Sequence, residues 1–139
     1  MTQEYKELLL RDLCARLPYG IKFLRESWNY ETDQELSVIK VLEDIDKDGY
    51  INNTKVYKVE DIKPYLFPLS SMTEEQEKEY DILRDSVSTY HYEFGDVMVD
   101  DTKLCDNWKS IDYLNAHHFD YRGLIEKGLA IDATNLNIY

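Results

Sequence analysis

Two clusters of side chains in this sequence are of types that bind metal ions or transfer protons. The first consists of the pair His117 and His118 together with Asp120. A catalytic zinc needs three ligands that converge on one point, and two ligands on a helix share a face when they lie three or four residues apart. His117 and Asp120 meet that spacing, whereas adjacent histidines diverge. A small metal-dependent hydrolase using these three residues is therefore one hypothesis.

A structural role for His118 is the simpler interpretation. The residue continues a helical stripe of apolar side chains, which predicts a core or boundary histidine with a hydrogen-bonded ring nitrogen. The other members of that stripe are Leu104, Trp108, Ile111 and Leu114. We therefore predict no catalytic residue, no metal ligand and no cofactor in this chain.

The second cluster is a run of aspartates at alternate positions, Asp44, Asp46 and Asp48, followed by Gly49. These match positions 1, 3, 5 and 6 of a calcium-binding loop, whose position 12 is normally a glutamate that supplies two oxygens. Lys55 occupies position 12 here, and its ammonium group repels a cation. Because strand-like residues precede the run, we predict a β-turn without bound calcium.

Other signatures of catalysis are missing from the sequence, so we lean towards a protein that is not an enzyme. There is no nucleophile elbow, no phosphate-binding glycine loop and no CxxC pair, and the chain has five glycines. The cysteines, Cys14 and Cys105, are too far apart in sequence to indicate a zinc site, and we expect both to be buried free thiols.

Acidic residues dominate the charge of the chain. Its 139 residues contain 28 Asp and Glu against 16 Lys and Arg, which gives a formal net charge of -12. Such a charge disfavours direct binding to nucleic acid or to anionic membranes. With 43% hydrophobic and 13% aromatic residues, the chain is also unlike a disordered acidic tail. Neither a signal peptide nor a membrane span is indicated, and we expect a cytoplasmic protein.

Much of the acidic excess falls in residues 73–106, which contain eleven acids and three bases. One explanation is a solvated surface that maintains solubility. The other is recognition of a basic protein surface, with aromatic side chains as anchors. For that second possibility the candidate partner-binding residues are Glu75, Glu79, Asp101, Tyr90 and Tyr92. If the carboxylates share a face, they can also imitate a row of phosphates, which makes a DNA-mimic inhibitor of a nucleic-acid-binding enzyme an alternative function.

The first half of the chain is predicted to contain one helix followed by strands. Apolar spacing and acid-before-base pairs predict an amphipathic helix over residues 3–17, ended by Pro18 and Gly20. A strand is predicted near 20–28, and a hairpin of 36–45 with 50–59 around the Asp48–Gly49 turn.

The second half of the chain is predicted to be mainly helical. Two prolines in 62–72 indicate a crossing segment that is neither a helix nor a central strand. Thr73 and Gln76 form a capping-box pattern that begins a helix running to about residue 85. Alternating aromatics predict a bent strand or hairpin over 90–99. Helical spacing then returns over 104–118, and a short helix is expected over 122–127, ended by Gly128.

Three stretches are distinctive sequence motifs: EYKELLLRDLCARLPYG at 4–20, KPYLFPLSSMTEE at 63–75 and LNAHHFDYRGLIEKGLA at 114–130. With them the chain resembles an uncharacterised family of small acidic proteins from bacteria, phages and mobile elements of gut anaerobes. That resemblance implies an accessory protein of a mobile element and assigns no site.

These observations predict a single α+β domain over 1–139. Its expected parts are an N-terminal helix, a small antiparallel sheet or partly open barrel, and C-terminal helices. The preferred function is a non-enzymatic interaction protein that binds a protein partner through an acidic, tyrosine-rich surface. One candidate for that partner is a basic nucleic-acid-binding protein, and direct binding to nucleic acid or membrane is not expected.

Overall fold

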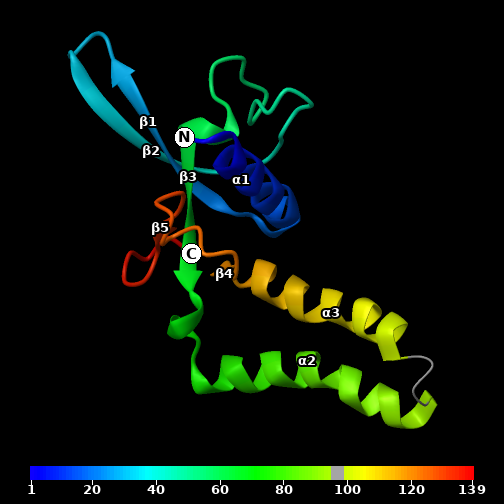
Figure 1. The fold of residues 1–139 in the computed structure, drawn as a ribbon. Coiled ribbons are helices and arrows are strands. Elements are labelled where there is room, and N and C mark those ends of the chain that lie inside the picture. Colours follow the sequence, from blue (N-terminus) through cyan, green and yellow to red (C-terminus); the bar gives the residue numbers. More distant parts are fainter. Residues whose placement is uncertain (95–98) are drawn as a thin grey trace.

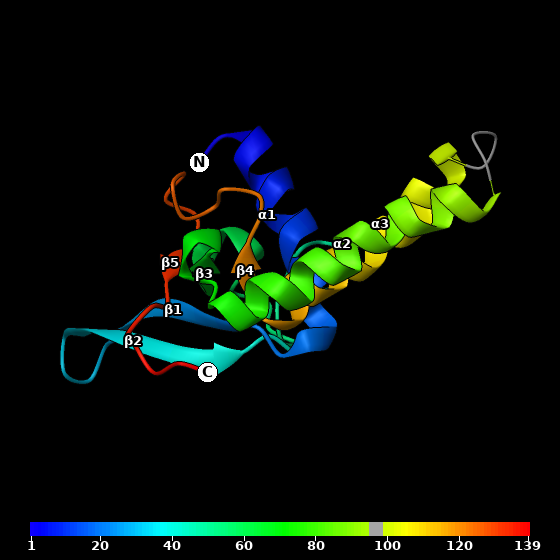
Figure 2. The same cartoon turned by 90° about the horizontal axis from the view of Figure 1, so that it is seen from below.

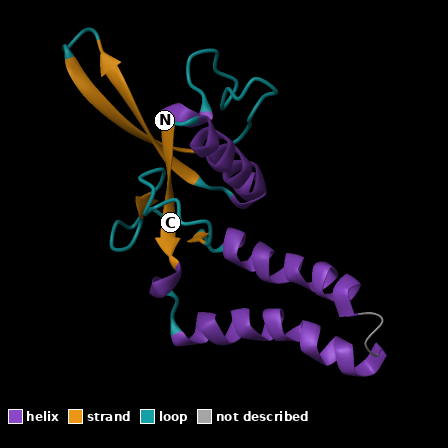
Figure 3. Ribbon diagram, viewed as in Figure 1, coloured by secondary structure: helices purple, strands orange, loops and turns teal. Residues whose placement is uncertain are grey.

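The computed structural model describes residues 1–94 and 99–139, with the side chains of 27–29 and 85–107 outside the described set. Figure 3 shows a small group of strands with a helix beside it and longer helices that extend away from it. The helices are α1 (Gln3–Arg16), α2 (Glu74–Phe94) and α3 (Val99–Ala116). The strands are β1 (Lys22–Asn29), β2 (Gln34–Val41), β3 (Ile62–Pro68), β4 (Phe119–Asp120) and β5 (Ile131–Asp132), and short 3₁₀ turns form η1 (Leu17–Tyr19), η2 (Val59–Asp61) and η3 (Leu69–Ser71).

The strands form one open sheet in the order β2-β1-β3-β4, with β5 also paired to β3. Strand β1 is antiparallel to both β2 and β3, whereas the two-residue strands β4 and β5 run parallel to β3. The sheet is therefore mixed. The α+β class with an N-terminal helix and C-terminal helices is confirmed (Figure 1).

Helix α1 forms where the apolar spacing predicts it. Its first turn is capped by Thr2, whose hydroxyl accepts a hydrogen bond from the Tyr5 amide at 3.2 Å. The chain then turns at Gly20, which has a left-handed φ of 68°. Leu9 and Leu13 of α1 are fully buried. They pack in a core with residues of the sheet, the central loop and the later turns: Ile21, Phe23, Leu42, Ile51, Val59, Ile62, Leu66, Leu124, Leu129 and Ala130.

The strand expected near 20–28 is present as β1, but the predicted hairpin of 36–45 with 50–59 is wrong. Strand β2 pairs instead with β1, in an eight-residue register from Lys22↔Val41 to Asn29↔Gln34. The turn around Asp48 does form, since the Gly49 amide donates to the Asp46 carbonyl at 3.0 Å. Beyond it the pairing is limited to isolated bridges, because the residues of β2 have already bonded to β1.

Residues 62–72 were predicted to be a crossing segment that is neither a helix nor a central strand, and this is wrong for 62–68. Residues 62–68 form β3, which lies between β1 on one side and the short strands β4 and β5 on the other. Its prolines, Pro64 and Pro68, flank the positions that bond to the short strands. The Phe67 amide donates to the His118 carbonyl and the Leu66 carbonyl accepts from the Ala133 amide, both at 2.8 Å. Neither bond uses the nitrogen of a proline, so the lack of an N–H group on Pro64 and Pro68 does not disrupt them.

The capping box that begins α2 is confirmed, since the Thr73 amide donates to Gln76 Oε1 at 3.0 Å and the Gln76 amide donates to Thr73 Oγ1 at 3.1 Å. The helix continues to Phe94, beyond the predicted end at about 85. The strand expected over 90–99 is therefore wrong for 90–94 and 99, which are helical, while residues 95–98 lie outside the described residues. No proline or glycine interrupts 74–94, so nothing in the backbone stops the helix.

Helices α2 and α3 pack against each other as an α-helical hairpin, which we call the helical arm. Both views show the arm extending away from the sheet and from α1 (Figures 1 and 2). The β1–β2 hairpin also extends from the core, in a different direction. No helix in the described part of the chain has the length and apolar character needed to span a bilayer.

After β4 the predicted helix over 122–127 is replaced by turns. The carboxylate of Asp120 accepts hydrogen bonds from the amides of Leu124 at 2.9 Å and Ile125 at 3.0 Å. These bonds fix a tight loop that ends at Gly128, whose φ of 74° is left-handed, as a helix-ending glycine would have. Gly128 therefore ends a local segment, as predicted, but that segment is a loop and not a helix.

Candidate functional site

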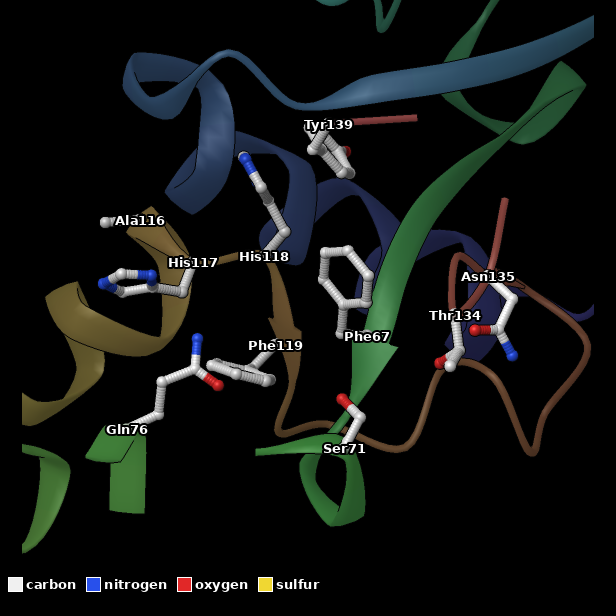
Figure 4. A pocket seen from close by; sticks show the side chains of 10 residues that line it. All are labelled: Phe67, Ser71, Gln76, Ala116, His117, His118, Phe119, Thr134, Asn135 and Tyr139. Carbon is white, nitrogen blue, oxygen red and sulfur yellow. The ribbon is translucent and has the colours of Figure 1, made fainter. Parts of the chain in front are cut away.

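A cleft of about 360 Å³ lies where the base of the helical arm meets the end of β3 (Figure 4). Three separate parts of the chain line it, namely β3 with the start of α2, the end of α3 with β4, and residues 134–139. Its ring-bearing side chains are Phe67, His117, His118, Phe119 and Tyr139, and its polar ones are Ser71, Gln76, Thr134 and Asn135.

His118 lies in the turn that follows α3, two residues after Ala116, in a left-handed conformation with φ 62°. Its ring stacks on that of Tyr139, with centroids 3.8 Å apart and planes 14° from parallel. Burial, together with the positive charges of Arg16 and, less strongly, Lys22, lowers the pKa of His118 to about 4. The imidazole is therefore neutral at physiological pH.

The expected packing position of His118 is confirmed, but its expected hydrogen-bonded ring nitrogen is not. Nδ1 of His118 is buried and has no hydrogen-bond partner among the described residues. What holds the ring in place is its contact with Tyr139. His118 is therefore a boundary histidine, as predicted, but its Nδ1 is unpaired among the described residues.

Tyr139 attaches residues 138–139 to strands β1 and β3 by hydrogen bonds. Its hydroxyl donates to the Tyr65 carbonyl at 2.8 Å and accepts from the Lys22 amide at 2.9 Å. The Lys22 ammonium also donates to the Ile138 carbonyl at 2.6 Å. Burial raises the pKa of Tyr139 to about 12, so the phenol stays protonated and can keep donating.

His117 and Asp120 have surroundings that differ from those of His118. His117 is exposed, and its ring lies 4.3 Å from that of Tyr113 between centroids. Both carboxylate oxygens of Asp120 are engaged by backbone amides. Within residues 1–94 and 99–139, no group of three His, Cys, Asp or Glu side chains is placed to hold a metal ion. The structure does not bring His117, His118 and Asp120 together as a ligand set.

The acidic candidates Glu75 and Glu79 are exposed on α2, near the base of the helical arm. Glu79 has a structural bond as well, because it accepts from the Tyr113 hydroxyl at 2.8 Å and so links α2 to α3. Burial and this bond raise the pKa of Tyr113 to about 12. The side chains of the other candidates, Tyr90, Tyr92 and Asp101, lie outside the described residues, although their backbones are helical.

An exposed apolar stripe on α3 was missed, because its spacing was taken to mark the core. Trp108 is 56% exposed and Ile111 is 37% exposed, whereas Ser110 and Leu114 are buried. The predicted stripe is therefore buried at Leu114 but exposed at Trp108 and Ile111. Helical spacing identifies a common face but not what covers it, and a two-helix arm leaves part of each helix uncovered.

The cysteines were predicted to be buried free thiols. Cys14 is exposed on α1, which corrects the expected buried thiol, while the side chain of Cys105 lies outside the described residues.

In the aspartate loop, Asp46 Oδ1 accepts from the amides of Asp48 and Tyr50, both at 2.9 Å. The predicted turn is thus confirmed, and the absence of calcium binding stays a prediction.

Comparisons with known proteins do not assign this chain to a family. No family model, curated protein or solved structure matches it. The functional argument therefore rests on the geometry of the helical arm and of the cleft at its base.

Proposed function

We propose that this protein is a non-enzymatic interaction protein whose helical arm binds a protein partner with a basic surface. The observation that carries this proposal is the 56% exposure of Trp108 on an arm that extends away from the core. Tryptophan side chains are on average well buried, and those left exposed are enriched among the residues that dominate binding energy at protein interfaces. Ile111, one turn further along α3, extends the same exposed stripe.

The charge of the arm supports a basic partner. Residues 73–106 carry eleven acids and three bases, and Glu75 and Glu79 are both exposed. A surface of one sign attracts a partner of the opposite sign before contact, which raises the association rate and makes it sensitive to salt. Tyr90, Tyr92 and Asp101 belong to this proposed surface by their position in the arm.

Affinity capture tests the proposal. The tagged protein, a Trp108→Ala variant and a Tyr30→Ala control are each used as bait at low salt in an extract of the source organism. Tyr30 is a suitable control because it is 89% exposed on the other projecting hairpin. We expect a basic protein that is retained by the wild type and by Tyr30→Ala, released by salt, and lost with Trp108→Ala. Equal capture by all three baits would contradict the proposal.

The same experiment separates the alternative of a DNA-mimic inhibitor. For a mimic, the retained protein binds nucleic acid and duplex DNA displaces it, since both ligands occupy one basic site. For the preferred function, displacement by DNA is not required. The role as an accessory protein of a mobile element rests on the resemblance of the three stretches, and action in the cytoplasm is a further part of the proposal.

A further inference from the structure

The cleft at the base of the helical arm has the dimensions of a small-molecule site. Its volume of about 360 Å³ falls within the range of roughly 300–1,000 Å³ that is usual for ligand pockets. It is formed by β3, the start of α2, the end of α3 and residues 134–139, which hydrogen bonds hold together. The exposed stripe of the helical arm, Trp108 and Ile111, does not line it. The proposed protein partner therefore leaves this cleft unexplained.

Aromatic rings form much of its wall. Phe67 occupies the centre of the view in Figure 4, with the Tyr139 and Phe119 rings near it. The centroid of the Phe67 ring lies 5.9 Å from that of Tyr139 and 6.4 Å from that of Phe119, and neither pair is face to face. Rings in this arrangement offer faces and edges to a planar guest, and heteroaromatic bases stack on them readily.

The charge of the cleft favours a neutral guest. Among the described residues that line it, none is an Asp, Glu, Lys or Arg. His118 is neutral as well, because its pKa is lowered to about 4. The positive charges of Arg16 and Lys22 that act on His118 are engaged by the Asp12 carboxylate and the Ile138 carbonyl, and the net charge of -12 on the whole chain disfavours anions.

Gln76 supplies a directional polar group. Its Oε1 is already used by the capping box, where it accepts from the Thr73 amide. Figure 4 shows the Gln76 amide pointing between the rings of His117 and Phe119. The Nε2 group has no hydrogen-bond acceptor among the residues that the structure describes, so its two N–H donors remain for a ligand. A guest with ring-nitrogen or carbonyl acceptors would satisfy them.

From this geometry we propose that the cleft binds a neutral, planar heteroaromatic molecule of the nucleobase or nucleoside type. The base packs on the face of the Phe67 ring with the tilted Tyr139 ring at its edge, and Gln76 Nε2 donates to an acceptor on its rim. Ser71, Thr134 and Asn135 provide hydroxyl and amide groups at the rim.

Titration with adenosine, followed by calorimetry and by backbone amide NMR shifts, tests this proposal on the full chain. We expect saturable binding with a dissociation constant below about 1 mM, with shifts at Phe67, Gln76 and Asn135 and none at Tyr30. Adenosine monophosphate should bind at least about fivefold more weakly, because its phosphate meets an acidic protein. No saturable binding, shifts confined to other residues, or equal affinity for the phosphorylated compound would each overturn the proposal.

A matched pair of variants tests the role of Gln76. Gln76→Glu keeps the oxygen that the capping box needs but removes the amide donor, so the fold is retained and adenosine should bind about fivefold more weakly. Gln34→Glu adds the same charge at an exposed position of β2 and should bind as the wild type does. Unchanged affinity in Gln76→Glu, or an equal loss in Gln34→Glu, would contradict the assigned site.

Discussion

The carboxylate of Asp12 on α1 binds the guanidinium group of Arg122, 110 residues further along the chain, with an Oδ1 to Nη1 distance of 2.8 Å. Its other oxygen, Oδ2, accepts from Arg16 Nε at 2.8 Å. Asp12 and Arg16 are both fully buried, and Arg16 Nη2 also donates to the Phe119 carbonyl at 2.6 Å. This network attaches α1 to β4 and to the loop after it, directly beside the cleft.

Removing the shared carboxylate should be strongly destabilising. Asp12→Ala leaves the buried Arg16 without a counter-ion, and breaking a buried pair in this way typically lowers the free energy of unfolding by about 3–5 kcal/mol. Arg11→Ala is the control, since Arg11 is exposed on the same helix and should change stability by less than about 0.5 kcal/mol. Urea denaturation measures both. Similar stabilities for the two variants would show that the network contributes little.

Acid should weaken the fold through His118. The unfolded chain protonates this ring near pH 6.5, whereas the folded protein does so only near pH 4. Between these values the unfolded state binds more protons, so the contribution is complete above pH 6.5 and is lost as the pH falls to about 4. Asparagine tolerates the positive φ, so His118→Asn should keep the backbone conformation. The variant should lose less of its free energy of unfolding than the wild type does as the pH falls from 6.5 to about 4. A pH profile parallel to that of the wild type would contradict the assignment.

Truncation of the same side chain tests its packing role. His118→Ala should lower the thermal unfolding midpoint, because the stack on Tyr139 is lost and alanine is strained at a φ of 62°. The metal content of the wild-type protein is the companion measurement. Stoichiometric zinc that disappears in His118→Ala would instead favour the hydrolase hypothesis.

The aspartate loop should not bind calcium tightly. Lys55 stands where a calcium loop has its glutamate, and Asp46 Oδ1 is already bonded to two backbone amides. Isothermal titration with calcium should therefore give no binding tighter than about 1 mM, the weak end for such loops. Tighter, saturable binding would refute this prediction.

Local signals in the sequence predicted local structure well. Apolar spacing placed α1, the pair Thr73 and Gln76 placed the start of α2, and Asp48–Gly49 placed a turn. Strand partners were harder, because pairing joins distant residues and depends on which strands compete. The β-branched run of β2 pairs with β1 rather than with residues after the turn, and β3 tolerates prolines that flank its outer bonds.

The candidate site was predicted only in part. His118 was identified and its boundary position was correct, but its stacking partner, Tyr139, is 21 positions away and had no pattern to mark it. The cleft joins Phe67, Gln76 and Tyr139 from three parts of the chain, so no spacing rule brings them together. Trp108 was assigned to the core because its stripe is helical, and exposure depends on neighbours that spacing does not specify.

The most direct test of the proposed function is the association rate of a captured partner with a charge-reversed arm, measured by surface plasmon resonance. Glu75→Lys with Asp101→Lys changes charge on the arm and leaves the bond between Glu79 and Tyr113 in place. Glu35→Lys with Glu43→Lys makes the same change at exposed positions outside the arm. We predict that the arm variant associates about tenfold more slowly at low salt, while the control resembles the wild type, because steering by surface charge is local and screened over about 8 Å at physiological salt. Equal rates for all three proteins would contradict the account and leave the acidic segment as a solubilising surface.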